Sequence, residues 1–556
     1  MLVPPARSPS VRSRLARLTA APLAAALLVA ALTPVVPAQL DVLEVVSLAD
    51  DESEGNGFVT GSSVSDDGRF VAFSGRASNL VEGTPEPDGD YIYLRDRLLG
   101  TTTLVTRDTE GNPSSAGGGT NVLMSGDGNW LVFDSFHSDL VEDDGNNTRD
   151  VFLYSVASGT IRRISERLGG GDANGGSFAS GVSVDGSRVL FECWASDLVP
   201  ADDNDEFDAY VWDRTADRSF LVSRPAGGPG AGYLNDRSFA GRLSANGRYA
   251  TFNTEATNVG LGDDTSDRDG YVVDLDTLEV RQVTLGESGE QIGFFPATAS
   301  GVSDDGRYVV FTAELSSYCD EDTNNVEDYY VRDMLTGDNE LVSVASDGDQ
   351  MFVHDVFLGG EMSADGRYVL FGTRSGVFQP GISGGHMDAY VRDRVNGVTE
   401  IVTVYSDGGF LPFDSTLYAM STDGRFITYQ NNFDLLPGET NETSDIYLLD
   451  RRRGSLGLEV TGDTAGAPVT FALSGGTPFR PAALLLSLGV QGLQGSAAGL
   501  ITIGTPSFTV LLPLDGLGAQ GFTRTMPPAL AGQVLWSQGL DLATALLSPP
   551  VRTEVQ

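Results

Sequence analysis

The sequence predicts an all-β fold: a seven-bladed β-propeller of four-stranded blades, followed by a small, sandwich-like C-terminal β domain. Three observations lead to this prediction. A turn motif, Ser-x-Asp/Asn-Gly, begins seven times, at positions 65, 125, 183, 244, 303, 363 and 421. Successive copies lie 58–61 residues apart, which indicates one repeated supersecondary unit. After about residue 455 the repeat stops and the composition changes.

Each repeat contains four predicted strands, and the sixth copy shows them clearly. Residues 363–366 (Ser-Ala-Asp-Gly) suit a tight turn, and residues 367–371 follow as a strand rich in aromatic and β-branched residues. Further strands are expected at Asp388–Asp393 and at 400–403, and residues 358–362 complete the unit. An open solenoid of such units is the alternative. Because strands twist and exposed edges are avoided, a closed propeller is favoured.

Small residues mark the innermost strand of most units. They stand a few residues before the turn motif, where blades crowd toward a central axis, at Gly61, Gly181, Gly241, Gly301, Gly360 and Ala419.

Residues 1–38 are predicted to be an export signal. A start with four arginines precedes an apolar stretch at 21–36, and residues 36–38 (Val-Pro-Ala) fit a cleavage site. A retained membrane anchor is the alternative. We expect an exported protein, periplasmic, cell-surface or extracellular, with no membrane insertion after signal cleavage.

The ends of the propeller, expected over residues 39–454, are predicted to meet. Residues 41–47 match the last strand of a repeat, although no repeat precedes them. Pairing them with residues 445–450 would complete the seventh blade and remove two exposed edges. The competing strand for this position is 456–460, which follows the seventh repeat in the chain.

Residues 455–556 form the predicted C-terminal domain. Apolar runs at 469–473, 483–486, 500–503 and 508–512 are separated by Gly and Pro, which is typical of a small β domain.

The chain is strongly acidic. Its formal charge is −42, and −46 without the four arginines of residues 1–38. This charge disfavours binding to nucleic acid or to an anionic membrane.

The repeat, Ser-x-Asp-Gly-Arg with an aromatic strand and then Asp-x-Tyr-Val-x-Asp, resembles the TolB-type, WD-like propeller repeats of exported bacterial proteins. The resemblance covers roughly residues 41–453 and implies the fold of the blade. Two features depart from it: the repeats are longer than the usual blade, and the expected export signal runs directly into blade strands, so the α/β domain that precedes the TolB propeller is not expected here. The partners of TolB therefore do not carry over.

The most distinctive polar pattern lies just before the second of the two expected aromatic strands. Asp/Glu-x-Asn/Thr-x-x-x-Asp places oxygen ligands on alternate loop residues with a carboxylate downstream, which suits Ca²⁺. The alternative is that these side chains cap turns through their own backbone. The residues are Asp144, Asn146 and Asp150; Asp202, Asn204 and Asp208; Asp263, Thr265 and Asp269; Asp322, Asn324 and Asp328; and Glu439, Asn441 and Asp445.

No catalytic residue is predicted. Residues 381–385 (Gly-Ile-Ser-Gly-Gly) fit a nucleophile-elbow string, but they fall in a blade loop rather than between a strand and a helix. The first hypothesis is a non-catalytic binding scaffold for a protein or polysaccharide of the cell envelope, because loops on a rigid frame serve binding. The alternatives are a glycan hydrolase or lyase, which needs only two placed carboxylates, and a purely structural surface protein.

Overall fold

The computed structural model describes residues 42–451, except for short gaps, and the strands between 457 and 554. The gaps are 86–88, 115–117, 201, 203, 205, 229–231, 263–265, 293–295, 315, 353–355, 379–384, 406–410, 412–413, 437–438 and 440–442. The predicted export signal, 1–38, lies outside the described residues.

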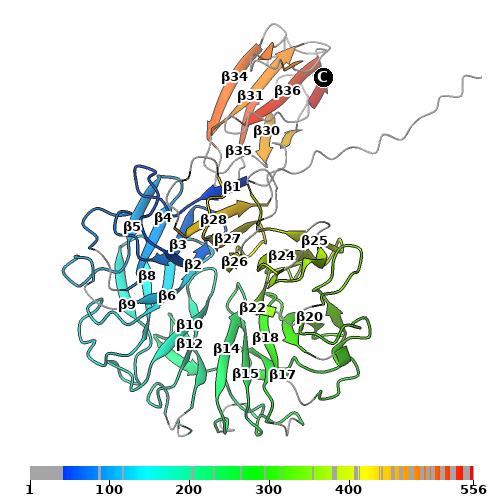
Figure 1. The fold of residues 1–556 in the computed structure, drawn as a ribbon. Helices are drawn as coiled ribbons and strands as arrows, with labels where there is room; N and C mark the ends of the chain where they lie inside the picture. The colour runs from blue at the N-terminus through cyan, green and yellow to red at the C-terminus, as the bar shows by residue number, and fades with distance from the viewer. Residues whose placement is uncertain are drawn as a thin grey trace, which may run out of the picture. The chain divides into compact units, whose positions relative to one another are not determined.

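Seven four-stranded antiparallel sheets form a propeller ring, which confirms the predicted fold class (Figure 1). Blades are numbered here in the order of their turn motifs. The first, innermost strands are β2 (Val59–Val64), β6 (Gly119–Met124), β10 (Ser177–Val182), β14 (Ser238–Leu243), β18 (Ala297–Val302), β22 (Val356–Met362) and β26 (Thr416–Met420). The second strands are β3 (Phe70–Gly75), β7 (Trp130–Ser135), β11 (Arg188–Cys193), β15 (Tyr249–Thr254), β19 (Tyr308–Ala313), β23 (Tyr368–Thr373) and β27 (Phe426–Asn431).

The outer half of each blade contains its third and fourth strands. The third strands are β4 (Tyr91–Asp96), β8 (Asp150–Ser155), β12 (Asp208–Asp213), β16 (Asp269–Asp274), β20 (Asp328–Asp333), β24 (Asp388–Asp393) and β28 (Asp445–Asp450). The fourth strands are β5 (Thr101–Leu104), β9 (Thr160–Arg163), β13 (Arg218–Leu221), β17 (Glu279–Gln282), β21 (Asn339–Leu341), β25 (Val398–Ile401) and, in blade 7, β1 (Val42–Val45). Two 3₁₀ turns, η1 (Ser316–Tyr318) and η2 (Gly376–Phe378), lie in loops.

The glycines of the innermost strands lie where neighbouring blades touch. A Cβ on Gly181 would lie 2.9 Å from the Cβ of Leu243, and one on Gly301 would lie 2.8 Å from the backbone nitrogen of Met362. Each innermost strand also contains a register shift at or near this position. The small residues therefore allow the close approach that the sequence predicted.

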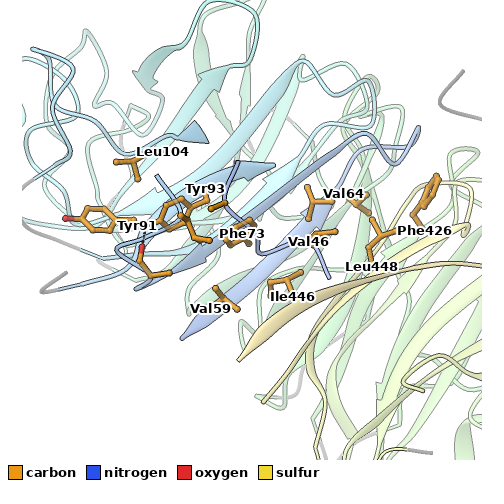
Figure 2. Close-up of a cluster of buried hydrophobic side chains, with 14 residues drawn as sticks. Val46, Val59, Val64, Phe73, Tyr91, Tyr93, Leu104, Phe426, Ile446 and Leu448 are labelled. Atoms are coloured by element: carbon orange, nitrogen blue, oxygen red, sulfur yellow. Dashed lines mark hydrogen bonds between the residues drawn. The ribbon is translucent and has the colours of Figure 1, made fainter. Parts of the chain in front are cut away.

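The N-terminal strand completes the seventh blade, as predicted. β1 pairs with β28 in antiparallel register, from Val42 opposite Asp450 to Val45 opposite Tyr447. In Figure 1 the blue β1 lies beside the yellow β28. The competing segment 456–460 overlaps β29 (Gly457–Thr461), which pairs with β30 instead. Figure 2 shows the core at this junction, where Val46, Ile446 and Leu448 lie near the blade 1 residues Val59 and Phe73.

The repeated motif ties each turn together through its side chains. In blade 6 the Ser363 hydroxyl donates to Asp365 Oδ1 at 2.6 Å and accepts the Tyr368 N–H at 2.9 Å. Asp365 Oδ1 also accepts the Arg367 N–H at 3.0 Å. The Arg367 guanidinium forms two hydrogen bonds to Asp393, at the end of the third strand. Every polar residue of the motif therefore has a structural role within its blade.

The seven turns are joined to one another around the central axis. Each turn makes a backbone or side-chain hydrogen bond to the next, at 2.7–2.9 Å. The last turn closes the circle, because the Thr422 N–H donates to the Asp66 carboxylate of blade 1 at 2.8 Å. The donor–acceptor pairs are Asp66–Gly126, Asp127–Val184, Val184–Ala245, Asn246–Asp304, Asp304–Ala364, Ala364–Thr422 and Thr422–Asp66.

The C-terminal strands form two sheets and a short hairpin. One sheet has the order β29-β30-β35 and the other β34-β31-β36-β37. The remaining strands are β30 (Pro468–Ser474), β31 (Pro481–Leu488), β32 (Gln494–Gly495), β33 (Ile501–Thr502), β34 (Ser507–Pro513), β35 (Gln520–Thr525), β36 (Val534–Asp541) and β37 (Val551–Glu554). Within the described part of the chain, no helix has the length and hydropathy that a membrane span requires.

Candidate functional site

The ring has two ends that differ in their loops. The turn end carries the Ser-x-Asp/Asn-Gly turns and the short connections between third and fourth strands. The opposite end, called the loop end here, carries the longer connections between second and third strands and between consecutive blades. Both candidate sites in the described residues, an aromatic strip and the acidic loops, lie at the loop end.

Aromatic side chains gather at the loop end of blades 2 to 4. Trp194 lies edge-on to Phe207, with ring centres 5.1 Å apart, and Phe207 stacks on Phe239 at 6.3 Å. Phe178 lies 6.1 Å from Trp194 and 6.2 Å from Phe207. Phe136 follows the second strand of blade 2 just as Trp194 follows that of blade 3. We call these five residues, together with Arg149, Arg237 and Arg268, the aromatic strip.

The two most exposed rings of the strip are Phe136 and Trp194, at 47% and 45% exposure. Trp194 is nevertheless held in place. A Cβ on Gly175 would lie 2.1 Å from its Cδ1 atom, and one on Gly176 would lie 3.2 Å from its Cζ2 atom. These glycines let the indole pack directly on the backbone. Trp194 is thus fixed on one side and open to solvent on another.

The arginines of the strip lie against its rings and are paired with carboxylates. Arg149 packs against Phe136 and Phe178, with its guanidinium carbon 4.7 and 4.9 Å from the two ring centres. It also pairs with the buried Asp134 at 3.4 Å.

The second pairing in the strip is shared by two arginines. Glu255 pairs with Arg237 at 2.7 Å and with Arg268 at 2.9 Å, and both guanidinium groups face Phe239. These two ion pairs lower the pKa of Glu255 against the opposing effect of its burial. Arginine–carboxylate pairs thus lie against the aromatic rings toward both ends of the strip, while the central rings contact one another.

The strip was not predicted from the sequence, because it does not lie in the repeated motifs. The residue type at these positions differs from blade to blade: the position of Trp194 is occupied by Arg76 in blade 1 and by Asn432 in blade 7. A comparison of the seven repeats at their variable positions would have shown aromatic residues in neighbouring blades.

The acidic loops predicted to bind calcium form buried hydrogen-bond networks in blades 3 and 5. In blade 3, Tyr210 donates to Asp202 at 2.7 Å, while Asn204 and Ser223 donate to Asp208 at 3.0 and 2.7 Å. In blade 5, Tyr330 likewise donates to Asp322, Ser343 donates to Asp328 at 2.5 Å, and the Asn324 amide donates to a backbone carbonyl.

The asparagines of these loops use their side-chain oxygen within the loop. Asn146, Asn204 and Asn324 each accept the backbone N–H two residues later, at 3.0 Å. This is the turn-capping role that was the alternative to calcium. Because the asparagine oxygens accept these hydrogen bonds, the paired carboxylates are the side chains of the pattern that remain to bind a cation in these blades.

Blade 2 has an arginine beside its acidic pair. The Arg163 Nη1 atom lies 3.6 Å from Asp144, 4.0 Å from Asp150 and 2.5 Å from Asp172. Phe152 stands where blades 3 and 5 have the tyrosine that donates to the loop, so a guanidinium replaces the hydroxyl as the partner of the acid.

The remaining loops are described in part. Asp263, Thr265 and Asn441 lie outside the described residues. Asp269 accepts from Thr284 at 2.6 Å, and Asp445 accepts from Ser47 at 2.6 Å. Glu439 accepts from the Tyr447 hydroxyl at 3.0 Å, as the loop acids of blades 3 and 5 do.

Calcium binding by these loops stays a prediction, and it has a direct test. Millimolar Ca²⁺ is expected to raise the melting temperature more than NaCl of equal ionic strength, because a ligand of the folded state stabilises it. Replacing Asp322 and Asp328 together by Asn should shrink this difference. Replacing Asp144 and Asp150 should shrink it less, because Arg163 already places a positive charge beside that pair. Equal shifts with Ca²⁺ and NaCl would show that these side chains cap turns and do not bind calcium.

Burial gives the carboxylates at the start of the third strands unusual proton affinities. It raises the pKa of Asp208, Asp328 and Asp388 to about 7 and that of Asp150 to about 6, although a Ser or Thr hydroxyl donates to each. These acids are therefore protonated in the folded protein at pH values where the unfolded chain has lost the proton.

The raised pKa values predict a stability that falls with pH. An unfolded Asp has a pKa of about 3.9, so the contribution is full below about pH 4 and is lost as pH rises through about 6 to 7. The melting temperature should decline over this range, and Asp388→Asn, which cannot ionise, should flatten the decline. Thermal melts at a series of pH values measure it. An unchanged slope in the variant would show that Asp388 is not protonated in the folded state.

The nucleophile-elbow string is not placed, because residues 379–384 lie outside the described part of the chain. The central channel contains a cavity of about 140 Å³ at its turn end. Arg242 of blade 4 and Glu361 of blade 6 both line it and lie 3.8 Å apart. Burial raises the pKa of Glu361, which also accepts the Met420 N–H at 2.8 Å. This pair connects two non-adjacent blades.

No protein-family model and no curated protein matches the chain. Among solved structures it is similar to a TolB from Agrobacterium tumefaciens, with 18% identity and a TM-score of 0.29 over 51% of this chain and 80% of that one. Trypanosoma rangeli sialidase has 9% identity and a TM-score of 0.29 over 89% and 90% of the two chains. A GH74 enzyme from Niastella koreensis has 10% identity and a TM-score of 0.22 over 83% and 66%. These likenesses concern the fold alone and assign no function.

Proposed function

We propose that the protein is an exported, non-catalytic, TolB-like binding propeller, and that it holds a component of the cell envelope on the loop end of blades 2 to 4. The single observation that supports this most strongly is the aromatic strip. Large aromatic side chains exposed side by side are uncommon on a soluble protein and mark interaction sites. Here they stand on the ends of rigid strands, which lowers the entropic cost of binding.

The experiment compares retention of solubilised envelope material by the immobilised wild type and by two variants. Trp194→Ala with Phe207→Ala removes the centre of the strip, and this variant should lose retention. Leu335→Ala removes an exposed apolar residue at the turn end and should retain as the wild type does. Loss of retention in the Leu335 variant alone would place the binding surface at the other end.

Glycan hydrolysis is the second candidate function, favoured by two carboxylates beside the strip. Burial raises the pKa of Glu192, and Asp134 is a buried acid on the preceding blade. Each, however, accepts a backbone N–H from the first strand of the next blade, from Ala240 at 3.2 Å and Ala179 at 3.1 Å. These bonds give both acids a structural role. Recovery of retained material with unchanged length distinguishes binding from hydrolysis.

A further inference from the structure

The strip offers apolar faces that water solvates poorly. Phe136 and Trp194 are about half exposed, and Phe178, Phe207 and Phe239 are partly buried behind them. Because the backbone at Gly175 and Gly176 holds Trp194 in place, a flat apolar surface can lie on its indole without a prior rearrangement of that side chain. An occupant with flat, weakly polar faces would release the water that these rings order.

Each arginine of the strip already has a carboxylate partner. Asp134 pairs with Arg149, and Glu255 pairs with both Arg237 and Arg268. The whole chain is acidic as well, with a formal charge of −42. A polyanion would be repelled by the molecule and would find no unpaired guanidinium in the strip. The charge pattern therefore favours an uncharged occupant.

Paired guanidinium and carboxylate groups still have hydrogen-bonding capacity. A guanidinium has five N–H donors, and a carboxylate has about four acceptor sites, so one contact leaves several of them available. Arg237 is exposed and Glu255 is half-buried, beside Phe239. Donors and acceptors that lie next to ring faces match a molecule whose edges carry hydroxyl groups and whose faces carry C–H groups.

We infer that the aromatic strip binds an uncharged polysaccharide. The C–H faces of its pyranose rings would stack on Trp194 and Phe136, and its hydroxyl groups would bond to Arg237 and Glu255. This inference rests on the proposed function and specifies its ligand class. A chain polymer also fits the shape of the site, because the strip crosses three blades rather than closing around one small molecule.

Native gel electrophoresis in the presence of a soluble polysaccharide tests the inference. Glucomannan and hydroxyethylcellulose serve as uncharged probes and alginate as the anionic one. The uncharged probes should retard the wild-type protein, and alginate should not. Trp194→Ala and Phe136→Ala should each weaken the retardation about tenfold or more, as expected for a central aromatic contact. Trp194→Phe, which keeps a ring, should recover part of it.

The control is Phe433→Ala, which removes a ring of similar exposure from blade 7 and should leave retardation unchanged. All variants should stay folded and unfold in one cooperative transition, because the side chains they lose are about half exposed. Retardation by alginate instead would overturn the uncharged class while leaving the strip as the binding site. Envelope protein retained through the strip, with no response to any polysaccharide, would overturn the polysaccharide but not the proposed function. Retardation that survives all strip variants would overturn both.

Discussion

Deleting residues 39–48 is expected to prevent the propeller from folding as a stable monomer. The deletion removes β1, the fourth strand of blade 7, together with the buried side chains of Leu43, Val46 and Leu48. Burying each such side chain contributes about 1.5–3 kcal/mol. The Ser47 hydroxyl, which donates to the buried Asp445 at 2.6 Å, is also lost. The sum approaches the 5–15 kcal/mol that stabilises a typical domain.

The deletion also leaves β28 as an open strand edge that can pair with another chain. Size-exclusion chromatography and thermal melting measure both consequences: aggregation and a large drop in melting temperature. The matched control is truncation after residue 451, which removes the C-terminal strands but none of the strands in the seven blades. An N-terminal deletion that elutes and melts as the full chain does would contradict closure by β1.

Arg425→Ala is expected to cost about 3–5 kcal/mol of unfolding free energy, because it leaves the buried Asp450 without its cation. Arg425 and Asp450 are only 6% and 3% exposed, and two hydrogen bonds of 2.9 Å join them. Chemical denaturation of wild type and variant measures the difference. Replacing both residues by Leu should recover much of the loss, since no unpaired charge then remains.

The same contact in blade 5 supplies the control. Arg307 makes the equivalent pair with Asp333 and also lies against the aromatic ring that follows it, but its side chain is 39% exposed. Arg307→Ala should therefore lower the unfolding free energy much less than Arg425→Ala does, because loss of the partly exposed Arg307 side chain lets water reach the remaining carboxylate. Equal losses in the two variants would show that burial does not set the strength of these pairs.

The fold could be predicted from the sequence because the residue pattern of one blade occurs seven times along the chain. The turn motif recurs at nearly equal spacing. Residues 41–47 match the last strand of a repeat although no repeat precedes them, which indicates that they complete the seventh blade. Gly181 and Gly301 could be placed on the inner strands for the same reason, since only small residues fit where blades converge. A structural requirement that is the same in every blade selects the same residue type at equivalent positions of every repeat, and the sequence shows this as a periodic pattern.

The candidate site could not be predicted in this way. Trp194 and Phe136 occupy equivalent places in neighbouring blades, but the same place holds charged or polar residues elsewhere in the ring. Arg163 likewise has no counterpart in the other blades, and its approach to Asp144 depends on the pairing of β8 with β9. Features that occur once have no periodicity, and the distances between loops emerge only when the blades are assembled.

Hydrogen–deuterium exchange with and without glucomannan tests most directly whether the protein binds through the aromatic strip. Protection is expected in the segments that contain the strip, residues 134–149, 176–179, 192–207 and 237–239, and around Arg268. It should disappear in the Trp194→Ala variant. The turn end, with its ring of hydrogen bonds from Asp66 to Thr422, should exchange equally in both conditions. Protection confined to the turn end, or to blades 5 to 7, would contradict binding through the strip.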